Sequence, residues 1–321
     1  MLIVQDAART PSGTKGAVVA IGNFDGVHRG HHHVIGTAGR IARATGAPLA
    51  VLTFDPHPRC FFRKDGPALQ ITSFAQKLDL LEALGVDAVF ALRFDAALAA
   101  RTAEDFIRGI LIDRLAVRQV VVGRDFRFGA RRSGDTDLLR TKGEAAGQIA
   151  GFGVTLVAAQ AHGLSVHSST GIRDALERGD PEAAGRILGR PWTVRGRLER
   201  PAGASRADAR LWIASYTALG AGQYRARLTA AGQTVDVVAL ARTSAYGGSQ
   251  DAWLDLTIPG SPRSLQGRMA DLALLDRLAV PLAPAAGQRA GQSRWNSPPA
   301  TRLLEKNFLS EPFLGSETHH A

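Results

Sequence analysis

The chain has 321 residues, of which 45% are hydrophobic and 21% are charged. This composition is typical of a folded globular protein, and it excludes both a disordered chain and a bundle of membrane helices. The formal net charge is +10. Because the basic residues form no dense block and few aromatic residues lie between them, we expect sites for small anions and no nucleic-acid partner.

Cysteine usage and the N-terminal segment bear on localisation. The single cysteine, Cys60, excludes an internal disulfide and suits a reducing compartment. The N-terminus has no basic region followed by a long apolar core, and no apolar run reaches about 18 residues. We therefore expect a cytoplasmic protein with no membrane partner, whose oligomeric state the sequence leaves open.

Short apolar runs alternate with helical patterns in the first half of the chain. Near-continuous apolar runs predict strands at 17–21, 49–54, 88–94, 117–123 and 154–159. Apolar residues at three- and four-residue spacing predict helices at 74–84, 103–115 and 137–148. Buried strands separated by helices indicate a doubly wound α/β domain with a parallel sheet, in which ligands bind beyond the carboxyl ends of the strands.

The sequence GNFDGVHRGH directly follows the first predicted strand. Its glycines, Gly22, Gly26 and Gly30, allow a tight turn and a close approach of backbone to ligand. His28 and His31 lie where a helix begins, and a helix N-terminus presents unpaired N–H groups and a partial positive charge. The motif therefore predicts a phosphate site at which both histidines donate to phosphate oxygens.

A zinc site is the alternative explanation for this group of histidines, which comprises His28, His31, His32 and His33. Zinc requires three or four ligands, commonly with a cysteine, a distant histidine or a carboxylate among them. No such partner is evident in the sequence, so we expect no metal site there. The chain also contains neither a P-loop nor a dinucleotide-binding fingerprint.

A second group of polar residues lies in the sequence HSSTGIRDAL, at residues 167–176. Hydroxyl residues before an apolar helical pattern are typical of a helix N-cap, and a plain capped helix is one interpretation. The other interpretation is functional. Since the stretch closes the same predicted domain, Ser169, Thr170 and Arg173 supply the hydroxyls and the guanidinium that a triphosphate requires.

Four motifs in this order resemble the bacterial bifunctional riboflavin kinase/FAD synthetase family, within the nucleotidylyltransferase superfamily. They are GNFDGVHRGH, FDPHP, VVGRDFRFG and SSTGIRDALERGDPEAAGRILGRPW, and the resemblance runs from about Ala17 to Trp192. It implies a doubly wound FAD synthetase domain over residues 1–190. It also implies transfer of AMP from ATP to FMN with Mg²⁺, which gives FAD and pyrophosphate.

The same resemblance assigns roles to individual residues. It implies a catalytic set of His28, His31 and Arg173. It implies ATP and phosphate binding by Gly22, Asn23, Phe24, Asp25, Gly30, Ser169 and Thr170. It places on the flavin or adenine side Asp55, His57, Asp125, Phe126 and Phe128. Alternatives remain for three of these assignments: a helix-start role for Asp25, a packing role for His57, and core positions for the two phenylalanines.

The last third of the chain departs from the family. Strand-like runs at 210–216, 223–230, 234–241 and 252–258 predict a small antiparallel barrel over residues 191–285. In the family this barrel is the riboflavin kinase module, marked by a GxPTAN stretch and a catalytic glutamate. Here no PTAN occurs, and Trp253 stands opposite the glutamate. We therefore expect a degenerate kinase module, followed by a linker and flexible tail over 286–321.

Three functions follow from these patterns. The favoured one is an FMN adenylyltransferase without riboflavin kinase activity. The second is a non-catalytic paralogue that binds flavin or nucleotide, although such a protein has less physical reason to keep both phosphate-handling motifs. The third is the full bifunctional enzyme, which also converts riboflavin to FMN.

Overall fold

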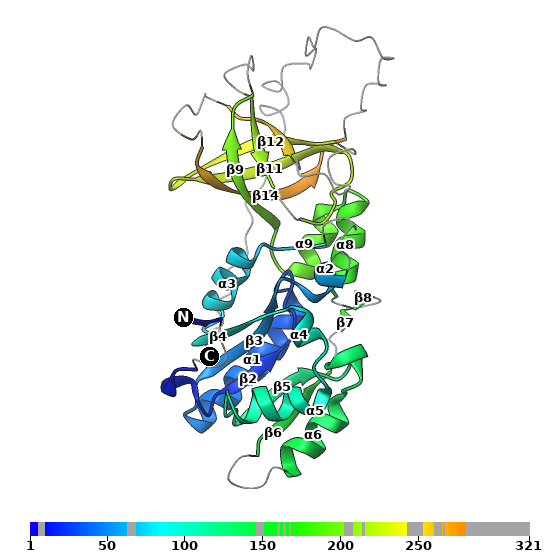
Figure 1. Ribbon diagram of the computed structural model, residues 1–321. Coiled ribbons are helices and arrows are strands. Elements are labelled where there is room, and N and C mark those ends of the chain that lie inside the picture. Colours follow the sequence, from blue (N-terminus) through cyan, green and yellow to red (C-terminus); the bar gives the residue numbers. More distant parts are fainter. Residues whose placement is uncertain are drawn as a thin grey trace, which may run out of the picture.

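The computed structural model describes residues 1–5, 10–62, 69–145, 151–158, 161–162, 165–166, 168–201, 208–213, 216–242, 253–259, 265 and 267–279. The described chain forms a layered α/β part and a β-barrel above it, as Figure 1 shows. The linker and tail predicted over 286–321 lie outside the described residues.

A parallel sheet of six strands forms the centre of the α/β part, in the order β1-β4-β3-β2-β5-β6. Its strands are β1 (Leu2–Val4), β2 (Val18–Ile21), β3 (Leu49–Asp55), β4 (Ala88–Arg93), β5 (Gln119–Gly123) and β6 (Gly153–Val157). The chain runs from β2 to β3 and β4 on one side, and β5 returns to the other side of β2. The strand order therefore reverses between β2 and β5, which is where doubly wound sheets bind ligands.

Helices cover both faces of this sheet, because alternate residues of each strand enter different hydrophobic clusters. Val18 and Ala20 of β2 pack with helix α1, whereas Val19 and Ile21 pack with the helical segment that follows β4. The helical elements are η2 (Ser12–Thr14), α1 (Arg29–Thr45), α2 (Pro58–Phe62), α3 (Phe74–Ala83), α4 (Ala96–Ala99), α5 (Ala103–Phe106), η3 (Ile107–Ile112), η4 (Ala130–Arg132), α6 (Thr136–Ala145), α8 (Ser169–Glu177) and α9 (Pro181–Leu188). The predicted doubly wound fold is confirmed.

One predicted helix is wrong in its geometry. The stretch 103–115 begins as α5 but continues as a π-helix, η3, from Ile107 to Ile112. The apolar residues Ile107, Ile110 and Leu111 face the core in either geometry, so their spacing could not distinguish the two. Among the described helices, none is long and apolar enough to cross a membrane.

The second part of the fold is a closed antiparallel barrel with the strand order β10-β13-β12-β11-β14-β9. Its strands are β9 (Trp192–Glu199), β10 (Asp208–Trp212), β11 (Gly222–Ala230), β12 (Gln233–Ala241), β13 (Trp253–Thr257) and β14 (Met269–Arg277). A separate two-stranded sheet joins β7 (Ala161–His162) and β8 (Ser165–Val166). The predicted barrel is confirmed, although the sequence analysis missed strands β9 and β14.

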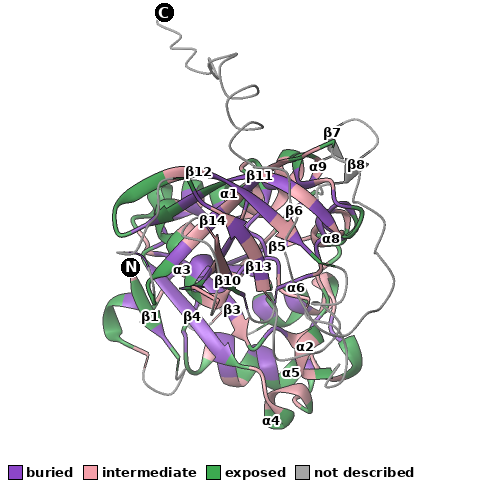
Figure 2. Ribbon diagram, turned by 90° about the horizontal axis from the view of Figure 1, so that it is seen from above, coloured by how far each residue is buried: buried purple, intermediate pink, exposed green. Residues whose placement is uncertain are grey.

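The barrel shares its hydrophobic core with helices α8 and α9. Ile172 and Leu176 of α8 are buried in one cluster with Trp192 and Leu272 of the barrel. Figure 1 shows α8 and α9 between the sheet and the barrel, and Figure 2 shows buried residues on barrel strands and on the sheet beneath them. The packing is therefore continuous across residue 190, where the sequence predicts a domain boundary.

Candidate functional site

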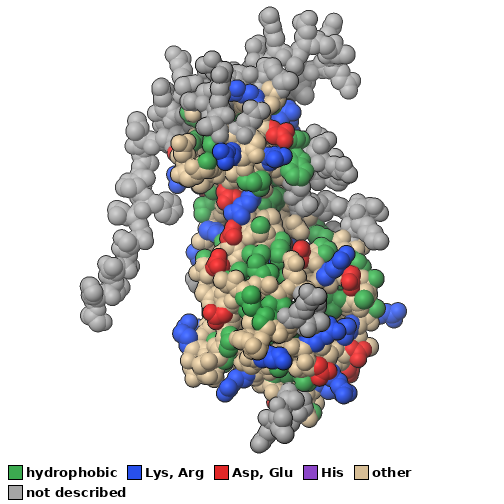
Figure 3. All heavy atoms as spheres, turned by 60° about the vertical axis from the view of Figure 1, so that its left-hand side comes forward, with side chains coloured by type: hydrophobic (Ala, Val, Ile, Leu, Met, Phe, Trp, Pro, Cys, Tyr) green, Lys and Arg blue, Asp and Glu red, His purple; other side chains and the backbone are tan. Residues whose placement is uncertain are grey.

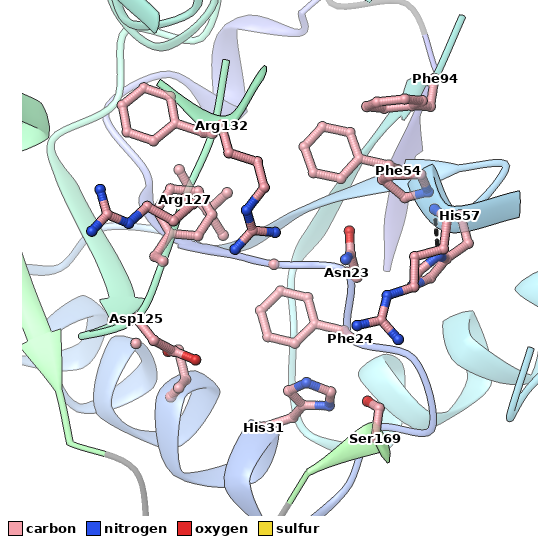
Figure 4. Close-up of a pocket in the computed structure, with 18 of the residues that line it drawn as sticks. Asn23, Phe24, His31, Phe54, His57, Phe94, Asp125, Arg127, Arg132 and Ser169 are labelled. Atoms are coloured by element: carbon pink, nitrogen blue, oxygen red, sulfur yellow. Dashed lines mark hydrogen bonds between the residues drawn. The ribbon is translucent and has the colours of Figure 1, made fainter. Parts of the chain in front are cut away.

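A pocket of about 820 Å³ opens at the carboxyl edge of the sheet. Its walls come from the segments after β2, β3, β4, β5 and β6, and from the start of α8. The predicted site residues that line it are Gly22, Asn23, Phe24, His28, Gly30, His31, His57, Asp125, Phe126, Phe128, Ser169, Thr170 and Arg173. Residues from four motifs far apart in the sequence thus meet in one cavity, which Figure 4 shows in close-up.

His28 and His31 cap helix α1 reciprocally. The His31 backbone N–H donates to Nδ1 of His28 at 3.3 Å, and the His28 N–H donates to Nδ1 of His31 at 3.4 Å. The two rings stack with their centroids 3.6 Å apart. Since each Nδ1 accepts a hydrogen bond, the ring proton of each neutral imidazole resides on Nε2. Both rings therefore carry an Nε2–H donor at a helix N-terminus.

His31 is held in its neutral form. Burial lowers its pKa well below the usual value of 6.5, and the neighbouring His28 lowers it further. Nδ1 also cannot accept the N–H of His28 if it carries a proton. His31 therefore presents a neutral donor to the pocket rather than a cation.

The loop between β2 and α1 adopts a strained backbone that other segments hold in place. Phe24 and Val27 have positive φ angles of 49° and 40°, which non-glycine residues rarely adopt. Lys77 Nζ donates to the Asn23 carbonyl at 3.0 Å, and Arg190 Nη1 donates to the Val27 carbonyl at 3.0 Å. Both cations thus fix the carbonyls of the loop so that its other groups face the pocket.

Lys77 is a residue that the sequence analysis missed. It lies on α3 and is only 5% exposed. Burial lowers its pKa, while Asp25 and Asp55 oppose that shift. A lysine at the partly polar start of a predicted helix carries no signal of burial, because only the tertiary fold brings it against the loop after β2.

Asp25 has a different place from the one predicted. Its side chain is 2% exposed, does not line the pocket, and accepts hydrogen bonds from the Ile71 N–H at 2.9 Å and from Arg173 Nη2 at 2.5 Å. Burial raises its pKa, whereas the adjacent Arg173 and Lys77 oppose the shift. Asp25 therefore anchors Arg173 rather than facing a ligand, and Asp55 likewise lies outside the pocket lining.

The start of α8 completes the same end of the pocket. Ser168 caps the helix by accepting from the Gly171 N–H at 3.2 Å, which agrees with the predicted N-cap. Ser169 Oγ donates to the Asp25 carbonyl at 3.2 Å, so it joins α8 to the loop after β2. Arg173 is 6% exposed, and its Nε donates to the Leu69 carbonyl at 2.8 Å. Its Nη1 makes no hydrogen bond to the described residues and remains for a ligand.

An aromatic wall forms another side of the pocket. Phe54 and Phe94 meet edge to face with their centroids 5.8 Å apart, and Phe126 stacks on Phe128 at 5.4 Å. The sequence analysis assigned no role to Phe54, although it begins the FDPHP motif. It missed Phe94, because only the pairing of β3 with β4 brings the ends of these strands together. Aromatic faces of this kind suit a planar ring system. Phe128 is also 7% exposed and part of the core, so it has the packing role too.

His57 lies beside this wall. It is 7% exposed, and its Nδ1 accepts from the Arg59 N–H at 3.1 Å, the bond dashed in Figure 4. Burial lowers the pKa of His57 to about 3, with Lys77 and Arg173 adding to the effect. His57 is thus a neutral side chain at neutral pH.

The charge of the pocket lining is strongly positive. Its arginines are Arg59, Arg101, Arg127, Arg131, Arg132 and Arg173, against the single carboxylate of Asp125. Apart from Arg173, the sequence analysis missed these arginines. Within the described parts of the chain, no three histidine, cysteine or acidic side chains are grouped to hold a metal ion.

These features together define an α/β protein with a positively charged pocket next to an aromatic wall. The FAD synthetase family model matches residues 10–171, which is half of the chain, and the chain belongs to this family.

The similar curated proteins align with the N-terminal part of the chain. The bifunctional riboflavin kinase/FMN adenylyltransferase of Escherichia coli (strain K12) is 39% identical over 184 residues, which cover 57% of this chain and 58% of that protein. The protein of the same name from Pseudomonas fluorescens is 40% identical over 187 residues, with the same coverage. A putative protein of this name from Geobacillus thermodenitrificans is 40% identical over 178 residues, 55% of this chain and 91% of that protein. The chain thus matches less than two thirds of the length of the first two relatives.

A solved structure resembles the whole fold. It is described as a macrolide-efflux protein from Streptococcus pneumoniae, with a TM-score of 0.72 and 23% identity over 95% of this chain and 94% of that one. At this identity the likeness concerns the fold alone.

Proposed function

We propose that this protein transfers AMP from ATP to FMN, giving FAD and pyrophosphate. Family membership supports the proposal, as does the name FMN adenylyltransferase that the relatives carry. The observation that carries it is the meeting of two phosphate-handling ends about 140 residues apart. Ser169 and Arg173 of α8 both bond to Asp25 of the loop that positions His28 and His31.

The reaction needs alignment more than proton transfer. A phosphate monoester has a second pKa of about 6, so the FMN phosphate is already a nucleophile at neutral pH. One of its oxygens attacks the α-phosphorus of ATP, the bond from that phosphorus to the bridging oxygen breaks, and pyrophosphate leaves with the electron pair. The Nε2–H groups of His28 and His31 donate to the phosphate oxygens on which charge develops. Arg173 and Thr170 hold the departing pyrophosphate, and the Ser169 hydroxyl joins them when it turns from the Asp25 carbonyl to a phosphate oxygen.

The other walls suit the flavin. The rings of Phe54, Phe94 and Phe126 offer aromatic faces for the isoalloxazine or the adenine. Asp125 and the neutral His57 supply polar groups beside them. The cavity volume of about 820 Å³ is within the range of small-molecule sites.

Mg²⁺ fits this site as part of the MgATP substrate. Mg²⁺ commonly takes one or two carboxylates, substrate phosphates and water as ligands, and Asp125 is the one carboxylate in the described lining. The ion would neutralise charge on the phosphates. Within this proposal Asp125 is the side chain able to hold it.

We also infer that riboflavin kinase activity is lost. Trp253, which stands opposite the family's catalytic glutamate, begins β13 and pairs across strands with Trp212 of β10. An indole can neither accept the proton of a hydroxyl nor bind Mg²⁺. A barrel fold by itself does not imply the kinase reaction. Residues 202–207, part of the segment that replaces the PTAN stretch, lie outside the described residues.

The direct test mixes the purified full chain with FMN, ATP and Mg²⁺ and measures FAD by chromatography and pyrophosphate by a coupled assay. Equal amounts of the two products support the proposal. Tight flavin binding with neither product would instead identify the non-catalytic paralogue. Cytoplasmic localisation and the lack of a nucleic-acid partner stay predictions from the sequence.

A further inference from the structure

A turn that carries two arginines stands at the rim of the pocket in a costly backbone conformation. Arg131 and Arg132 form the consecutive left-handed pair of η4, with φ angles of 53° and 60°. Two adjacent non-glycine residues in this region are rare, and such strain persists only where the surrounding structure imposes it. The turn therefore requires contacts that stabilise this conformation, and the conformation is expected to serve a function.

Contacts with the start of α5 hold the turn. Phe128 and Gly134 pair their backbones across it, with N–H to carbonyl distances of 3.1 and 2.9 Å. Gly129 has a φ of 73°, and a Cβ there would lie 2.8 Å from the Ala103 backbone. The turn is thus clamped on both sides against α5, in the position that carries its two side chains to the pocket.

The same turn is joined to a third arginine. The Ala130 N–H donates to the Arg101 carbonyl at 2.8 Å. The Arg101 guanidinium lies over the π-helix η3, where a Cβ on Gly109 would be 3.2 Å from Nη1. Its Nε is buried and has no hydrogen-bond partner in the described structure. Gly109 of the π-helix η3 leaves space for the Arg101 guanidinium. Because π-helical turns are frequent at functional sites, this placement indicates a function for Arg101.

The three arginines, Arg101, Arg131 and Arg132, lie in a different part of the pocket from the histidines. Figure 4 shows Arg132 entering the cavity from one side, with Asn23 and Phe24 between it and His31 and Ser169. Arg127, the next cation along, is paired with Asp135 at 3.1 Å. Arg101, Arg131 and Arg132 have no ion pair with any described acidic residue.

We propose that Arg101, Arg131 and Arg132 form a second anion subsite, which binds the phosphate monoester of the acceptor substrate. This assignment rests on the proposed function, in which two separate phosphate groups must meet: the triphosphate of ATP and the phosphate of FMN. The histidine end takes the first. The arginine subsite binds the second, brings it to the α-phosphorus and offsets the repulsion between two anions.

The test measures steady-state FAD formation by the full chain with Arg132→Ala, Arg132→Lys and Arg101→Ala. The alanine variants are expected to raise KM for FMN about tenfold or more, the effect of losing a charge-assisted contact, and to leave KM for ATP within about twofold. Arg132→Lys is expected to regain part of the loss. Arg124→Ala is the matched control, because Arg124 is exposed in the same segment but does not line the pocket.

Two results would contradict the arginine subsite, and a third would contradict the proposed adenylyl transfer. A rise in KM for ATP with an unchanged KM for FMN would assign these arginines to the triphosphate and reject the proposal. Unchanged constants in both alanine variants would reject it as well. A wild-type chain that forms no FAD at all would refute the proposed function instead, and this result is visible before any variant is made. For the two Arg132 variants, thermal unfolding midpoints close to wild type are expected, since Arg132 is exposed.

Discussion

The two ring nitrogens of His31, at the start of α1, have different roles. Nδ1 of His31 caps the helix by accepting from the His28 N–H, while Nε2 is the donor that faces the pocket. An asparagine oxygen can reach the position of Nδ1, whereas a glutamine amide can reach that of Nε2. The two substitutions therefore test capping and catalysis independently.

We expect His31→Asn to retain stability and His31→Gln to retain activity in part. His31→Ala and His31→Asn should each lower adenylyl transfer by about a hundredfold, the scale of a lost oxyanion-type donor. The measurements are kcat for FAD formation and the unfolding midpoint of each variant. Equal activity of the asparagine and glutamine variants would show that Nε2 is not the group that acts.

Arg173 combines a structural and a chemical task, because its guanidinium pairs with the buried carboxylate of Asp25. Arg173→Ala should lower adenylyl transfer by about a hundredfold. It should also destabilise the fold by about 3–5 kcal/mol, since it leaves a buried charge without a partner.

The double variant Asp25→Asn/Arg173→Ala distinguishes these two effects. Its asparagine can still accept from the Ile71 N–H without carrying a charge. Stability measured by urea unfolding should recover in large part, while activity stays low. Recovery of both would mean that Arg173 acts only by holding the loop.

At the scale of elements, α3 links the barrel to the phosphate loop. Gln76 Nε2 donates to the Thr193 carbonyl of β9 at 3.1 Å, and Gln76 Oε1 accepts from the Tyr216 hydroxyl. The next residue, Lys77, donates to the Asn23 carbonyl on the other side. One turn of helix thus contacts both parts of the molecule.

We expect Lys77→Met to lower kcat for FAD formation by about ten- to a hundredfold, because the Asn23 carbonyl of the loop carrying the histidines loses its cationic donor and keeps, among the described donors, only the Thr53 hydroxyl. Lys142→Met on the exposed face of α6 is the matched control and should have no effect. Wild-type kinetics for Lys77→Met would show that the other contacts of the loop, those from Thr53 and Arg190 among them, position it without Lys77.

The sequence predicted the elements whose signal is local. The apolar runs of β2 to β6 and the barrel strands β10 to β13 were recognised from a few neighbouring residues each. β1 was missed because it has three residues, two of them exposed. β14 was missed because its apolar residues fit helical and strand spacing alike. For β9 the signal was present, since buried residues alternate with half-buried or exposed ones along Trp192–Glu199.

The site divides in the same way. The histidines, the α8 hydroxyls and Phe54 lie in compact motifs, whereas Phe94, Lys77 and Arg101 reach the site only through the order of the strands and the packing of α3 and α5. No pattern of neighbouring residues distinguishes them from ordinary core or surface positions. Asp25 shows the converse, since it belongs to a motif yet faces inward.

For the molecule as a whole, the shared core implies that α8 and the barrel unfold together. This cohesion comes from the apolar cluster that α8, α9 and the barrel strands share. The surface face in Figure 3 carries interspersed basic and acidic side chains. All four tryptophans, at 192, 212, 253 and 295, follow residue 190. Tryptophan fluorescence therefore reports on the C-terminal part alone.

Leu176→Ala on α8 should lower the fluorescence-detected unfolding free energy by about 2–5 kcal/mol, although it lies before residue 190. Leu139→Ala is the matched control, since Leu139 is equally buried but belongs to a cluster on the sheet; it should shift this transition less. An unchanged transition in Leu176→Ala would mean that α8 and the barrel are independent units.

The central claim is that the chemistry is adenylyl transfer and that the barrel contributes none. One preparation of the full chain, incubated with ATP and Mg²⁺ and either FMN or riboflavin, tests it most directly. We expect FAD and pyrophosphate in equal amounts from FMN, and no FMN or FAD from riboflavin. FMN formed from riboflavin would contradict the loss of kinase activity, and the absence of FAD from the FMN incubation would contradict the account itself.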